Sequence, residues 1–87
     1  MKNYLIINYI NNLTLNDIAS FALKNNINLD SKESHFILNY IKNNYNDILY
    51  DEEKTLSILK ESVSSDNYLK IKELYIYYKN KYKGYLF

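Results

Sequence analysis

The chain has 87 residues, of which 47% are hydrophobic, and eleven basic side chains against ten acidic ones give a formal net charge of +1. This length suffices for one domain and not for two, and the hydrophobic content is too high for a disordered chain. The absence of cysteine excludes disulfides, thiolate metal sites and cysteine nucleophiles. Proline is also absent and Gly84 is the one glycine, which argues against the tight turns of a sheet and favours helices.

The N-terminal segment does not have the pattern of a secretory signal. One lysine precedes an apolar stretch at residues 4–7, asparagines then interrupt it, and no small-residue cleavage site follows. No apolar run approaches the roughly 20 residues that span a bilayer. We therefore expect a cytoplasmic protein without a membrane span.

Apolar residues recur at helical spacing in five segments, which are about 2–12, 15–25, 31–44, 51–63 and 67–83. Residues that commonly cap helix starts precede or open four of them, namely Thr14, Asp30, Asp51 and either Ser65 or Asp66. Residues 48–50 are expected to form an apolar bridge, either extended or one helical turn. The sequence thus predicts an all-α fold, in which residues 1–87 form a single-domain bundle of four to five amphipathic helices.

The residues that could do chemistry have plainer structural interpretations. His35 has no second strong ligand among its helical neighbours, which favours a histidine at the rim of the core. The cluster of Asp47, Asp51, Glu52 and Glu53 could hold a divalent cation. It lacks the spacing and the glycine of a calcium loop, however, and it lies where the start of a helix already favours acids.

Nucleophilic and phosphate-binding chemistry also lack support. The serines at positions 57, 62, 64 and 65 have no histidine nearby and no Gly-x-Ser-x-Gly turn. A single glycine cannot build a phosphate-cradling loop. We therefore predict that the protein is not an enzyme and has no catalytic residue, metal, cofactor or small-molecule substrate.

The charge is distributed unevenly along the chain. Residues 67–87 hold five lysines and one glutamate, a net charge of +4, whereas residues 46–66 hold two lysines and six acids, a net charge of −4. Lysines interleaved with tyrosines could bind single-stranded nucleic acid by base stacking and phosphate contact, or lie on an anionic membrane. Five of these tyrosines share a helical stripe with Ile71 and Leu74, however, and this equally fits core residues whose hydroxyls reach the rim.

The opposite side of the same helix is less easily explained by a core. Leu69 and Ile76 lie there with Tyr77 nearby, and apolar residues on two sides of one helix suggest a protein partner, which includes a second copy. The candidate interaction residues are Leu69, Lys72, Ile76, Tyr77, Lys79 and Lys83. We expect a protein-interaction module, and the alternative is binding of RNA or single-stranded DNA by the same basic helix. Duplex recognition is disfavoured because the chain has no arginine and the segment 31–44 has little positive charge.

The order of helix caps and core positions along the chain is similar to that of a known family. The segments that carry this order are Ile10-Asn11-Asn12-Leu13-Thr14, Ala22-x4-Ile27-x-Leu29, Asn46-Asp47-Ile48, Ser64-Ser65 and Lys81-Tyr82. Over nearly its whole length the chain resembles the YqfT-like family, a domain of unknown function in Bacillus and its relatives. The resemblance implies an origin in a low-GC Gram-positive bacterium or a relative, and it assigns no functional residue.

Overall fold

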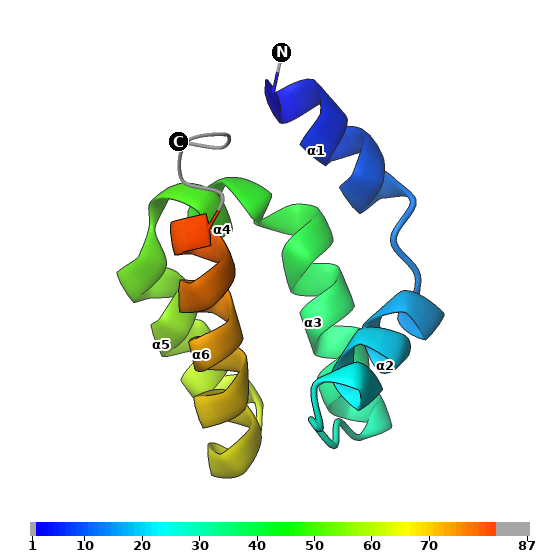
Figure 1. The fold of residues 1–87 in the computed structure, drawn as a ribbon, viewed down its shortest axis with the longest axis vertical. Helices are drawn as coiled ribbons and strands as arrows, with labels where there is room; N and C mark the ends of the chain where they lie inside the picture. The colour runs from blue at the N-terminus through cyan, green and yellow to red at the C-terminus, as the bar shows by residue number, and fades with distance from the viewer. Residues whose placement is uncertain (1, 82–87) are drawn as a thin grey trace. The chain divides into compact units, whose positions relative to one another are not determined.

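The computed structural model describes the backbone of residues 2–81 and the side chains of residues 7–81. Within this range the chain forms helices and no strand, so the predicted all-α fold is confirmed (Figure 1). The helices are α1 (Lys2–Asn11), α2 (Leu15–Lys24), α3 (Ser31–Asn43), α4 (Tyr45–Tyr50), α5 (Glu52–Ser62) and α6 (Ser65–Lys81). The predicted end of the last helix, residue 83, lies outside the described residues.

Helix α4 is the element that differs most from the sequence-based prediction. The sequence predicts a bridge at residues 48–50 that is either extended or one helical turn, and the structure shows these residues to be the second half of a helix of six residues. Asn44 separates α3 from α4 because its backbone, with φ −136° and ψ 32°, is not helical. Its N–H still donates to the carbonyl oxygen of Tyr40 at 2.8 Å. A helix of six residues has fewer than two turns, which is too short to show an apolar stripe in the sequence.

The described helices belong to two compact units, Met1–Tyr45 and Asn46–Phe87. The first unit contains α1 to α3, and the second contains α5, α6 and all of α4 except its first residue. The single domain predicted for residues 1–87 stays a prediction.

In the first unit, α3 packs against both α1 and α2. Among residues 7–45 no buried apolar side chain comes from α3; those that are buried are Ile10, Leu13, Ile18, Ala22 and Ile27. Ile27 lies in the connector between α2 and α3. Lys42 on α3 also donates to the carbonyl oxygen of Asn11, at 3.4 Å, and so links α3 to the end of α1.

The end of α2 shows why asparagine follows this helix. Asn26 has φ 59°, a left-handed conformation that asparagine tolerates better than most residues. The N–H of Asn26 donates to Leu23 at 3.2 Å, and the N–H of Ile27 donates to Ala22 at 2.8 Å. This pair of bonds is a Schellman motif, which satisfies the last carbonyl groups of α2 and turns the chain toward buried Ile27.

The predicted caps form hydrogen bonds at three helix starts. Thr14 and Asp30 each form a reciprocal capping box with the acidic residue three positions later. The Asp51 carboxylate accepts a hydrogen bond from the N–H of Lys54 at 3.1 Å and caps α5.

The predicted cap of α6 is wrong. Ser64 takes this position, because its hydroxyl oxygen accepts from the N–H of Asn67 at 3.3 Å and its carbonyl oxygen accepts from Tyr68 at 2.8 Å. Ser65 and Asp66 therefore lie inside the helix. Three consecutive residues of capping type occur here, so composition alone does not select among them.

In the second unit, α5 packs against α6, and Figure 1 shows the two helices side by side. Two side chains that can form hydrogen bonds, Thr55 and Asn67, are buried in this unit. The Thr55 hydroxyl donates to the carbonyl oxygen of Asp47 at 2.9 Å, which ties α5 to α4. No helix in residues 2–81 combines the length and the apolar character that crossing a membrane requires.

Candidate interaction surface

The side chains of α6 divide into a packed side and an exposed side. Asn67 is buried, and Ile71, Leu74 and Tyr78 are half-buried on the same side of the helix. On the other side Leu69 is 58% exposed and Tyr77 is 55% exposed. The packed side agrees with the stripe predicted from the sequence, as far as its members lie among the described residues.

Leu69, Glu73 and Tyr77 are all exposed and follow one another at intervals of four residues. Side chains at this interval lie on one line along a helix, and a rise of about 1.5 Å per residue separates Leu69 from Tyr77 by about 12 Å. We call these three residues the outer stripe. It presents two large apolar groups with a carboxylate between them.

Charges of both signs flank the outer stripe. Asp66, Lys70 and Lys81 are exposed and, at helical spacing, lie on the same side of α6 as Tyr77. Four lysines and two acids give α6 a net charge of +2 over Ser65–Lys81. The positive charge predicted for this helix is therefore interrupted by acids on its exposed side.

The candidate residues predicted from the sequence do not share one environment. Leu69 and Tyr77 are exposed, whereas Lys72, Ile76 and Lys79 are half-buried. The last candidate, Lys83, lies outside the described residues. The exposed side of α6 therefore includes Glu73, which is not one of the predicted residues, and excludes much of Ile76.

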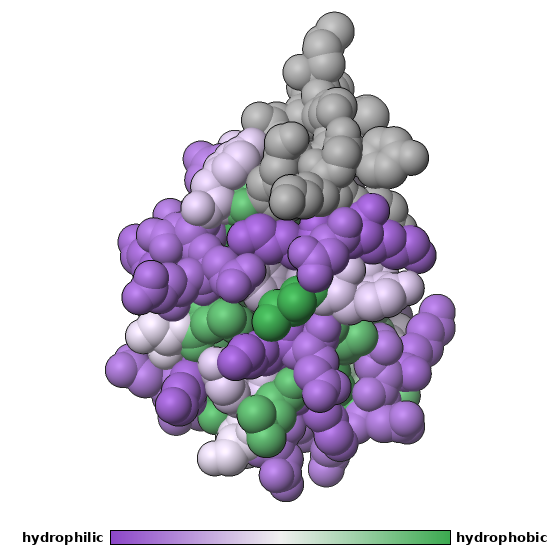
Figure 2. All heavy atoms as spheres, turned by 60° about the vertical axis from the view of Figure 1, so that its left-hand side comes forward, coloured by the Kyte–Doolittle hydropathy of each residue, from purple (hydrophilic) through white to green (hydrophobic). Residues whose placement is uncertain are grey.

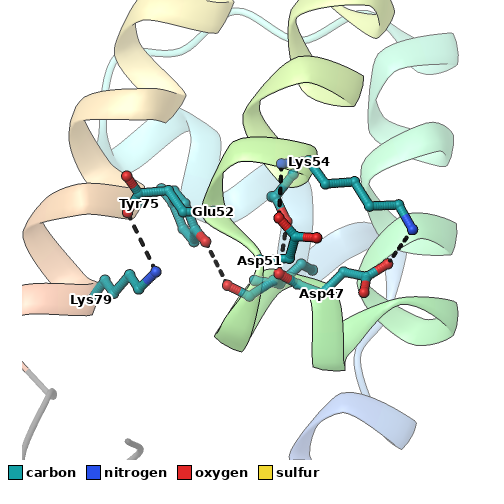
Figure 3. A network of polar contacts seen from close by, with 8 residues as sticks. Asp47, Asp51, Glu52, Lys54, Tyr75 and Lys79 are labelled. Carbon is teal, nitrogen blue, oxygen red and sulfur yellow. Dashed lines mark hydrogen bonds and ion pairs between the residues drawn. The ribbon is translucent and has the colours of Figure 1, made fainter.

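Lys79 is held within the second unit rather than presented to solvent. Its Nζ lies 3.3 Å from Oε1 of Glu52 at the start of α5, and its side chain is 25% exposed (Figure 3). The same Nζ lies 5.7 Å from the centre of the Tyr75 ring, within the range of a cation–π interaction. These contacts explain why Lys79 does not share the exposure of Leu69 and Tyr77.

The ring of Tyr77 is oriented by two neighbours. Lys81 Nζ lies 5.7 Å from its centre, and the Tyr78 ring meets it edge-on with centres 5.1 Å apart and an interplanar angle of 77°. A side chain already restricted in this way loses less conformational entropy when a partner covers it. Tyr77 is therefore well suited to act as a binding anchor.

Three of the four acidic residues near the start of α5 form contacts with other parts of the second unit. Asp47 forms an ion pair with Lys54 at 3.1 Å, Asp51 caps α5, and Glu52 pairs with Lys79 (Figure 3). In the part of the chain that the structure describes, no three histidine, aspartate or glutamate side chains gather so that they could hold a metal ion. The observed contacts of this cluster are those of helix capping and helix pairing.

His35 is exposed on α3, and its contacts are local. Its Nδ1 lies 2.8 Å from the carbonyl oxygen of Ser31 and 3.5 Å from the Ser31 hydroxyl. The short contact to a carbonyl oxygen requires a proton on Nδ1. Both of these contacts are to Ser31, one helical turn earlier in the same helix.

The surface around α5 and α6 is mainly hydrophilic. In Figure 2 apolar residues form separate spots between polar ones on the face that is turned forward. On α6, Leu69 and Tyr77 are the large apolar or aromatic side chains that are exposed, and Glu73 lies between them.

Glu73 is the residue of this surface that sequence reasoning missed. The signal was its position midway between Leu69 and Tyr77, four residues from each.

No protein-family model, curated protein or solved structure matches the chain. The resemblance to the YqfT-like family stays a prediction.

Proposed function

We propose that the chain is a cytoplasmic, non-enzymatic protein-interaction module that binds its partner through the outer stripe of α6. The observation that supports this most strongly is the exposure of Leu69 (58%) and Tyr77 (55%) on a helix whose opposite side is packed. Tyrosine is enriched among the residues that dominate the energy of protein interfaces, and a neighbouring leucine adds apolar area that a partner can cover.

The outer stripe defines the chemistry of the partner surface. Because Leu69 and Tyr77 stand about 12 Å apart along one helix, the partner must offer two apolar contacts at that spacing. Glu73 lies between them, so a cationic group is required opposite its carboxylate, since a buried unpaired charge is costly. The partner is either another protein or a second copy of this chain.

Affinity capture from native cells, followed by mass spectrometry, tests the proposal. The wild-type chain of 87 residues is compared with the double variant Leu69→Ser/Tyr77→Ser, and Leu23→Ser serves as the matched control because Leu23 is 77% exposed on α2. We expect proteins that the wild type and the control retain and the double variant loses. An identical set of proteins from all three baits would overturn the proposal, provided that thermal melting shows all three to be folded.

Sedimentation at micromolar concentration separates the two kinds of partner. A second copy as the partner predicts a dimer for the wild type and a monomer for Leu69→Glu. A strictly monomeric wild type rules out the second copy and leaves a different protein as the partner.

One observation favours the alternative of single-stranded nucleic acid. Lys81 lies against the exposed ring of Tyr77, and Lys70 is exposed on the same side, an arrangement that fits base stacking with phosphate contact. Asp66 and Glu73 lie among these lysines, however, and repel a polyanion.

Binding of labelled RNA and DNA oligonucleotides at low salt tests this alternative. It predicts binding that weakens steeply as salt is added and that Lys70→Gln/Lys81→Gln reduces. The absence of binding at low salt would discard it.

A further inference from the structure

We draw no further inference here: the strongest candidate, the exposed apolar side chains of Leu15 and Leu23 on α2 of the first unit, carries no proposal because nothing in the structure shows what covers them.

Discussion

The hydroxyl of Tyr75 on α6 donates a hydrogen bond to the carbonyl oxygen of Ile48 on α4, with 2.5 Å between the two oxygens. This bond and the one from Thr55 to Asp47 hold the short helix α4 against the longer helices of the second unit. Since a helix of six residues is unstable by itself, α4 depends on such tertiary contacts.

Replacing Tyr75 with phenylalanine should therefore loosen α4. We expect Tyr75→Phe to lower the free energy of unfolding by about 1 kcal/mol, because a partly buried carbonyl oxygen loses its donor. Urea denaturation measures this loss, and amide hydrogen exchange should show faster exchange in α4. Tyr77→Phe removes a hydroxyl from an exposed ring and is the control. Equal stability of the two variants would contradict this account of α4.

The same substitution at Tyr40 should have the opposite effect. The Tyr40 hydroxyl is buried and has no hydrogen-bond partner among the described residues. In the unfolded chain water bonds this hydroxyl, so burying it costs on the order of 1 kcal/mol or more. We expect Tyr40→Phe to raise the free energy of unfolding, measured by the same urea titration. A loss as large as that of Tyr75→Phe would mean that the hydroxyl finds a partner in solution.

The cap of α6 can be assigned by two single substitutions. Ser64→Ala removes the oxygen that accepts from the N–H of Asn67 and should cost about 1 kcal/mol of stability. Ser65→Ala changes the first residue inside the helix, where alanine is a good helix former, and should be close to neutral. Thermal melting of both variants checks the assignment, which fails if Ser65→Ala is the more damaging change.

The left-handed residue after α2 gives a second backbone test. Asn26→Ala should lower the free energy of unfolding by about 1 kcal/mol. Alanine tolerates the left-handed conformation, here φ 59°, less well than asparagine, whose side-chain amide can form local hydrogen bonds. Asn26→Gly keeps this conformation accessible and should be less damaging than Asn26→Ala. Circular dichroism during thermal unfolding compares the two, and the reverse order of stability would show that the Schellman motif does not set the backbone here.

The sequence predicts the helices well where local signals are strong. Thr14 and Asp30 form the expected capping boxes, and the predicted ends at Asn25, Asn44 and Val63 fall on the residues that cap the helix ends. These features follow from hydrogen bonds within a few residues of one another, so the sequence contains all the information that they require.

Tertiary features were less accessible from the sequence. The position of α4 depends on bonds from Thr55 and Tyr75, which are eight and 27 residues away from their acceptors. The exposed side of α6 depends on the other helices of its unit, as the contact of Lys79 with Glu52 shows. The apolar pattern of α6 predicts its packed side but places Ile76 on the exposed side, whereas Ile76 is half-buried because it lies near the edge of the region that its neighbours cover.

The alternation of charge along the exposed side of α6 bears on the kinetics of partner binding. Asp66, Lys70, Glu73 and Lys81 produce fields that largely cancel beyond a few ångströms, so they exert little attraction at long range. Without electrostatic steering, we expect encounter with the partner at an ordinary rate, about 10⁵–10⁶ M⁻¹s⁻¹, that changes little with ionic strength. The lifetime of the complex would then be set by how slowly Leu69 and Tyr77 leave their contacts.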